Sequence, residues 1–490
     1  MDIKKLRKVK NVALRMVKPT KSEIAEQKEV IDCLKKSIEE IGKKTGYKFL
    51  FIEEEGSTGI KQTQLKGASD IDIFVALSPN DYKSILKLPK KKMKEKLHKE
   101  FEMIVEKWFK PAAIDAGCTD IKITFAEHPY LSAKIKGFDV DILAGFWLEP
   151  QELLKRGPIT AVDRTPHHTR FVHKNLSTEQ RDEVRLLKAF LKACHVYGDK
   201  CAIGRSGFTG FSVELLIFFH KTFENTLMNF KNLPQHPIDF FGRERQELRK
   251  HPKFGKDFLI IVDPTDPNRN VAASIDKRAY LYVNHVSQNF LADPSIDYFI
   301  EKPIEPLSLG EKEKYKEHLV IVEFENTKNL HYVILRDKLY KLASQIAFLL
   351  EKEETGEERF GKTIYEVYFE EPIYAIGFYC MKRELKPYFL RRGPPSNMTN
   401  RVKDFLKKHP EAFEKNGFYW SKIKRKYTRP LDLVSDILIK QEGMLSKMIL
   451  KNVKFLGISN TGLTITGKRV AAVIIRMLLP VIYPELCFST

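Results

Sequence analysis

Two aspartates stand one residue apart in the apolar run DIDIFVAL, residues 70–77. Successive side chains of a β-strand point to opposite faces, so Asp70 and Asp72 would share one face. Neighbouring carboxylates repel each other unless a positive charge lies between them, and a divalent cation is the simplest candidate. The pattern therefore predicts a strand that carries metal ligands.

A second run, FDVDILAGF at residues 138–146, repeats the pattern with Asp139 and Asp141 on one face. If the two strands are neighbours, one of these aspartates joins Asp70 and Asp72 in a single pocket. Three carboxylates suit two-metal phosphoryl transfer, in which one ion lowers the pKa of an attacking hydroxyl and the other holds a triphosphate and the leaving pyrophosphate. Hard oxygen ligands favour Mg²⁺.

A glycine-serine turn, Gly56 and Ser57, precedes the first acidic strand by 13 residues. Glycine allows another group to approach the backbone closely, and backbone N–H groups with the serine hydroxyl can bind phosphate oxygens. The turn alone is a weak signal. Followed by the two acidic strands, it predicts a nucleotide-polyphosphate site beside the metal ligands.

These groups must be positioned by an α/β domain at residues 1–150. We expect an amphipathic helix at 22–45, a strand at 47–57 that runs into the turn, a Lys-rich helix at 82–110, and further strands at 119–146. The lysines of 90–99 are either a solvated face or an RNA contact.

From Ser177 the chain is predicted to be helical. Residues 177–198 open with a capping box, Ser177 and Gln180, and close at a glycine. Four cations recur on one face of this helix and are either surface residues or face a triphosphate or RNA: Arg181, Arg185, Lys188 and Lys192.

Less regular segments follow. We expect a strand ending in a turn at 258–273, strands at 316–324 and 329–336, a helix at 337–354, and a basic loop at 388–397. Aromatic residues near 388–392 and 418–426 alternate with cations, so they either stack on RNA or pack a small core.

Length and charge limit the possibilities further. A chain of 490 residues predicts three or four domains or subdomains. Its 84 Lys and Arg against 64 Asp and Glu, a formal charge of +20, favour a polyanionic partner such as nucleic acid or an acidic membrane over a merely basic surface. Its six cysteines lack zinc-ligand spacing, and the apolar stretch 470–483 is broken by Arg476 and Pro480, so we expect a cytoplasmic protein without a membrane span.

Several segments, in this order, resemble the class I, archaeal-type CCA-adding enzymes, which are tRNA nucleotidyltransferases: GSTGIKQTQLKGASDIDIFVAL, AEHPYLSAKIKGFDVDIL, AVDRTPHHTRFV, EVRLLKAFLKACHVYG, GFTGFSVELLI, VDPTDPNRNVAA and LRRGPP. The resemblance implies an α+β multidomain fold. Its parts would be a polymerase-beta-like nucleotidyltransferase head at 1–150, a helical neck at 151–275, an α/β body at 276–335 and 426–490, and a tail at 336–425.

The resemblance also assigns residues. Asp70, Asp72 and Asp141 match the metal-binding triad, which leaves Asp139 as a structural neighbour. The positions that match nucleotide-binding residues are Gly56, Ser57, Thr165, His168, Lys188 and Tyr197, with Arg269 helping to read the base. Where the family usually has an arginine three residues after the serine, this chain has Ile60, so Lys61 is the expected substitute, with less geometric definition than a guanidinium.

The implied activity is template-independent addition of C, C and A to the 3′ end of tRNA from CTP and ATP, with Mg²⁺. The implied partner is tRNA, held by its acceptor and TΨC arms, and a homodimer is left open. Two alternatives stay open at this point: another RNA 3′-terminal nucleotidyltransferase of the poly(A) or uridylyl type, and a noncatalytic RNA-binding relative.

Overall fold

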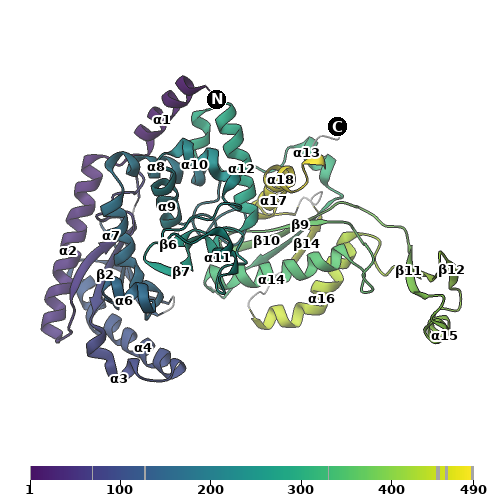
Figure 1. Ribbon diagram of the computed structural model, residues 1–490, viewed down its shortest axis with the longest axis horizontal. Helices are drawn as coiled ribbons and strands as arrows, with labels where there is room; N and C mark the ends of the chain where they lie inside the picture. The colour runs from purple at the N-terminus through teal and green to yellow at the C-terminus, as the bar shows by residue number, and fades with distance from the viewer. Residues whose placement is uncertain are drawn as a thin grey trace. The chain divides into compact units, whose positions relative to one another are not determined.

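The computed structural model describes residues 2–68, 70–125, 128–328, 330–448, 453–457 and 462–486, with only the backbone described at 441–448, 453–457 and 486. Cys487 lies outside these ranges. The chain divides into a first unit of Met1–Asp199, Phe208–Ile275 and Val283–Glu301, and a second unit of Lys200–Gly207, Asp276–Tyr282 and Lys302–Thr490. The expected α+β, multidomain fold is confirmed (Figure 1).

A mixed five-stranded sheet organises the N-terminal part of the first unit, with the strand order β1-β2-β5-β4-β3. β2 and β5 run parallel, and every other pair is antiparallel. The strands are β1 (Phe51–Glu55), β2 (Asp70–Leu77), β3 (Thr119–Phe125), β4 (Pro129–Ile135) and β5 (Phe138–Phe146). The two acidic strands are thus direct neighbours, as predicted.

One face of this sheet builds the core. Ile71, Ile73 and Val75 of β2 are almost fully buried and pack with residues of α2 (Lys21–Thr45) and α4 (Lys90–Ile104). Helix α2 confirms the helix expected at 22–45. It begins at a Thr20 capping box and ends at Gly46, whose φ of 78° suits glycine.

The helix expected at 82–110 is interrupted, and this prediction was wrong in detail. The structure has α3 (Lys83–Leu86), then α4, a π-helical turn at Val105–Phe109, and α5 (Lys110–Asp115). Pro89 explains the first break, because it has no backbone N–H and directs the preceding residue away from helical backbone.

Helices build the rest of the first unit. The N-cap of α8, Ser177, forms the predicted capping box with Gln180. The strand expected at 258–273 is a short hairpin, β6 (Val262–Asp263) and β7 (Asp266–Asn270). The helices are α1 (Ile3–Val17), α6 (Pro150–Arg156), α7 (Thr165–Asn175), α8 (Thr178–Ala193), α9 (Gly210–His220), α10 (Phe223–Asn229) and α11 (Arg245–Lys250), and α12 (Lys277–Ala292) contributes residues to each unit.

The second unit contains a four-stranded antiparallel sheet, β14-β8-β10-β9, and a three-stranded sheet, β11-β13-β12. The strands are β8 (Leu319–Glu325), β9 (Thr363–Glu370), β10 (Ile373–Cys380), β11 (Tyr388–Pro395), β12 (Phe413–Lys415), β13 (Phe418–Lys424) and β14 (Val453–Gly457). The helices are α13 (Leu309–Tyr315), α14 (Tyr332–Glu351), α15 (Thr399–Lys408), α16 (Pro430–Met448), α17 (Ile465–Ala472) and α18 (Leu479–Ile482).

Two expectations for this unit were wrong. The strand expected at 329–336 is instead the beginning of α14, because Leu335 and Leu339 belong to one buried helical face that continues to Leu350. The loop expected at 388–397 is largely β11, which pairs with β13 despite its glycine and prolines. A register shift between Arg392 and Pro395 accommodates them.

In the ranges that the structure describes, no helix combines the length and the apolar character that crossing a membrane requires.

Candidate active site

The parallel register of β2 and β5 sets the acidic side chains against one another. It aligns Asp72 with Asp141, and Asp70 with Asp139. Burial, together with the charges of Asp141 and Asp70, raises the pKa of Asp72 to about 6. Burial also raises the pKa of Asp141, opposed by a hydrogen bond from the Ser132 hydroxyl. The structure thus concentrates negative charge at this end of the two strands.

The oxygen donors fit a divalent cation, although they do not form a closed cage. Among the described residues, no group of three or more His, Cys, Asp or Glu side chains is arranged to hold a metal ion. The backbone of Gly56, with a φ of 66°, lies so close to Asp72 that a Cβ there would be 2.1 Å from Oδ2. The glycine-serine turn therefore lies directly against the carboxylates, and glycine is required at this position.

The loop that follows the turn is held at both ends. The Thr58 hydroxyl donates to the carbonyl of Asp70 at 3.0 Å, and the backbone N–H of Thr63 donates to the carbonyl of Ser57 at 3.0 Å. Helix α8 holds the rest. Arg185 donates to the carbonyls of Gln62 and Gln64, and the latter contact is 2.9 Å.

The basic face of α8 is consequently not a uniform surface. Arg185 and Lys188 are buried, whereas Arg181 is half-buried and Lys192 is exposed. The interpretation of these cations as surface residues is wrong for Arg185 and Lys188. Both hold the loop that carries Ser57.

A buried carboxylate on α9 connects the loop to this helix. Glu214 accepts a hydrogen bond from the Thr63 hydroxyl at 2.6 Å and pairs with Lys61 at 3.2 Å and with Lys188 at 3.8 Å. Burial opposes ionisation of Glu214, yet Lys61 and Lys188 lower its pKa. Burial lowers the pKa of Lys188 to about 8. Sequence analysis did not identify Glu214; its acidic position inside the apolar run GFSVELLI was the available signal.

Glu55 is a second buried acid that sequence analysis missed. It ends β1 directly before the turn, lies opposite Asp72 in the register, and accepts a hydrogen bond from the Thr169 hydroxyl. Burial raises its pKa to about 8. Within the described ranges its Oε1 has no hydrogen-bond partner. The run EEE before the glycine was the only sequence signal, and it resembles a solvated face.

His168 and Arg269 meet at one carboxylate. The Nε2 of His168, on α7, is 2.7 Å from Oδ2 of Asp263, and the guanidinium of Arg269 donates to the same oxygen at 2.8 Å. Asp263 is fully buried; despite this burial, its contacts with His168 and Arg269 lower its pKa. The ring of His168 also stacks on Phe211, with ring centres 3.9 Å apart.

Two more predicted residues lie in the same unit. Thr165 is the first residue of α7 and is half-buried. A Cβ at Gly210 would be 3.3 Å from the hydroxyl of Tyr197 and 3.9 Å from Nζ of Lys188, so these two groups converge where α9 begins. Burial raises the pKa of Tyr197. The first unit therefore contains every residue predicted for the site.

Comparison with known proteins identifies the family to which this chain belongs. Residues 182–300 match the tRNA nucleotidyltransferase second domain, and residues 317–455 match the CCA-adding enzyme C-terminal domain. The CCA-adding enzyme of Methanocaldococcus jannaschii is 30% identical over 442 residues, covering 87% of this chain and 89% of that protein. The CCA-adding enzyme of Archaeoglobus fulgidus is 30% identical over 437 residues, covering 87% and 88%.

Among solved structures, the Cid1 poly(U) polymerase is 14% identical, with a TM-score of 0.44 over 62% of this chain and all of that one. The identity to the archaeal proteins, extending over most of both chains, confirms the resemblance seen in the sequence motifs. This chain belongs to the CCA-adding enzymes, a family of tRNA nucleotidyltransferases.

Proposed function

We propose that this chain adds C, C and A to the 3′ end of tRNA from CTP and ATP, without a template, at the acidic end of β2 and β5. One observation supports the assignment of this activity to these carboxylates. The parallel register brings Asp72 beside Asp141 directly behind the turn at Gly56. Carboxylates beside a phosphate-binding turn are what nucleotidyl transfer requires.

Asp70, Asp72 and Asp141 would hold Mg²⁺, which when bound lowers the pKa of the attacking hydroxyl and neutralises the triphosphate. Asp141, with one bound ion, would activate the terminal 3′-hydroxyl of tRNA by accepting its proton. That oxygen forms a bond to the α-phosphorus of the nucleotide, and the bond to pyrophosphate breaks. The Ser57 hydroxyl and the backbone N–H groups of the turn bind the departing phosphates.

Residues of α7, α8 and the hairpin would position the nucleotide. We assign Thr165, His168, Lys188 and Tyr197 to its sugar and phosphates. Arg269, fixed by Asp263, presents several donors in one plane to acceptors on cytosine and adenine. Lys61 would act on the triphosphate mainly by shaping the loop, since its Nζ already pairs with the buried Glu214.

The four-part division into head, neck, body and tail stays a prediction, with tRNA contacts assigned to body and tail. The sheet β11-β13-β12 fits a tail that meets RNA phosphates. Cations cover its aromatic rings: Arg392 is 3.9 Å from the ring centre of Phe418, and Lys422 is 4.7 Å from that of Tyr388. Cations at a protein surface attract a polyanion.

Changing Asp72 to Asn tests the assignment of the site. The substitution keeps the side-chain shape and removes one charge, so the fold should stand, while addition of CMP should fall by about 10³-fold or more because transition-state charge is no longer stabilised. Asp139→Asn is the matched control, since Asp139 lies on the same strand face, is exposed, and should keep near-wild-type activity. Single-turnover CMP addition to a tRNA that ends at the discriminator base provides the measurement.

Offering CTP, ATP, UTP and GTP separately to the wild-type protein distinguishes the alternatives. Growth limited to C, C and then A supports the proposal, whereas long homopolymers would support a poly(A) or uridylyl transferase. Near-wild-type addition by Asp72→Asn would remove the metal-site assignment.

Changing Glu214 to Gln tests whether this carboxylate positions the loop that follows Ser57. The neutral amide leaves Lys61 and Lys188 without their buried countercharge, so the loop should shift, the KM for CTP and ATP should rise about 10-fold, and stability should fall by about 3 kcal/mol. Glu183→Gln is the control, because Glu183 pairs with Lys10 away from the loop. Steady-state kinetics with each nucleotide, beside denaturant unfolding, provide both numbers. A KM equal to that of the control would contradict this role.

Changing Asp263 to Asn tests nucleotide selection. Without the charge that fixes Arg269 and His168, discrimination against UTP and GTP should fall by about tenfold, the scale of one well-placed base contact. Asp239→Asn removes another carboxylate with low side-chain exposure, which pairs with Arg243, and should leave fidelity unchanged. The measurement is the ratio of kcat/KM values for CTP and UTP. An unaltered ratio would assign Asp263 to folding alone.

A further inference from the structure

A large basic cavity lies at the other end of β2 from the carboxylates. Its volume is about 960 Å³, and its walls come from the segment after β2, from α3 and α4, and from the region around α6. Ser78, directly after β2, is part of the lining. It is six residues beyond Asp72, which corresponds to roughly 20 Å along an extended strand. The cavity is therefore separate from the catalytic carboxylates.

The lining is strongly positive. It includes two carboxylates, Glu149 and Glu152, and six cations: Lys83, Lys87, Lys90, Lys94, Arg156 and Arg164. Arg156 is paired with Glu152 at 2.7 Å, and Arg164 with Asp266 at 3.0 Å.

Three of the lysines in the lining have side chains that are accessible to a ligand. Lys83, Lys87 and Lys90 are exposed, and within the described part of the chain no carboxylate pairs with them. Like charges placed this close repel one another, so their alignment along one cavity favours a polyanionic occupant.

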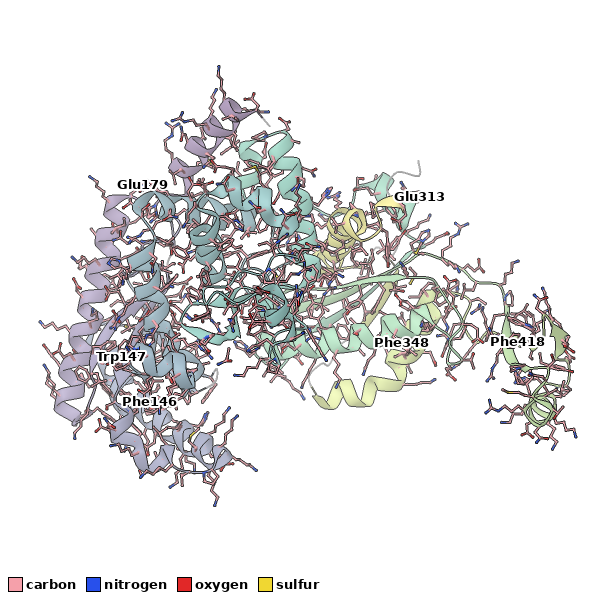
Figure 2. All side chains as sticks on the ribbon, in the orientation of Figure 1. Phe146, Trp147, Glu179, Glu313, Phe348 and Phe418 are labelled. Carbon is pink, nitrogen blue, oxygen red and sulfur yellow. The ribbon has the colours of Figure 1, made fainter. Side chains whose placement is uncertain are left out.

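Hydrogen bonds fix the part of the lining that comes from residues 158–164. The buried carboxylate of Asp163 accepts hydrogen bonds from the backbone N–H groups of Phe146, Ile159 and Thr160 at 2.6–2.9 Å. This fixes the segment that leads to Arg164. Trp147, labelled in Figure 2, also lines the cavity, but its ring already stacks on His167 and lies 4.2 Å from the guanidinium carbon of Arg170.

A second hollow connects this cavity to the nucleotide-selecting residues. It has a volume of about 480 Å³ and is lined by Arg269. The two hollows share three lining residues, Arg156, Pro158 and Arg164. The two hollows therefore adjoin at Arg156 and Arg164, with Arg269 in the lining of the second hollow and the lysines of α3 and α4 in that of the first.

We infer that this basic cavity binds the phosphate backbone of the tRNA substrate, as a contact surface on the catalytic domain itself. The inference rests on the proposed function. The contact is made to phosphates because lysines dominate the lining and the one tryptophan is already stacked, so it fixes the position of the RNA without reading its sequence.

The test changes Lys83, Lys87 and Lys90 to Gln together in the full chain. Affinity for a tRNA lacking CCA should fall about tenfold at 0.1 M KCl, and the slope of log Kd against log [KCl] should become shallower by about 2, because three phosphate contacts no longer release counterions. Changing Lys91, Lys92 and Lys96 to Gln is the matched control. These lysines lie on α4, are exposed, and do not line either hollow, so affinity and slope should stay near wild type.

Amine acylation of the wild-type protein, read by mass spectrometry, gives a second measurement without substitution: tRNA should protect Lys83, Lys87 and Lys90 but not the control lysines. Equal effects in the two triple variants, or equal protection, would overturn the inference. A higher KM for CTP with unchanged tRNA affinity would assign the cavity to nucleotide and also overturn it. Wild-type CMP addition, measured in parallel, tests the proposed function independently, since a protein that adds no CMP would fail there whatever its tRNA affinity.

Discussion

The repulsion among the aspartates at the end of β2 and β5 is the constraint on which the rest of the first unit depends. Parallel pairing aligns Asp72 with Asp141, and burial, together with the charges of Asp141 and Asp70, raises the pKa of Asp72. A fold optimised only for stability would not place them there. The cost is understandable if the site holds cations while it transfers a nucleotide, because charge that repels in the free protein stabilises the transition state.

A second charge arrangement keeps the turn in place beside these carboxylates. Glu214, Lys61 and Lys188 are buried together, which is favourable only because each charge has a partner. Side chains of α8 and α9 thereby fix the loop that we propose binds phosphate. Asp263 performs the same task for His168 and Arg269. In both places a buried acid holds the cations that we assign to nucleotide binding.

Sequence reasoning predicted the parts of the site that follow from local patterns. Alternation placed Asp70 and Asp72 on one face, and capping chemistry placed the beginning of α8. It could not find Glu55, Glu214 or Asp263, because each acquires its role only through residues distant in the chain. Periodicity also failed where tertiary packing decided the outcome, as at the beginning of α14, where a short apolar run suits a strand and a buried helix equally well.

Calorimetric titration of MgCl₂ into the full chain, with a non-hydrolysable CTP analogue present, measures metal binding by Asp70, Asp72 and Asp141. We expect two bound ions per chain, retained in Asp139→Asn and weakened or lost in both Asp72→Asn and Asp141→Asn, with each variant folded as judged by its melting curve. Equal Mg²⁺ binding by wild-type and Asp72→Asn proteins, or binding lost only in Asp139→Asn, would contradict it.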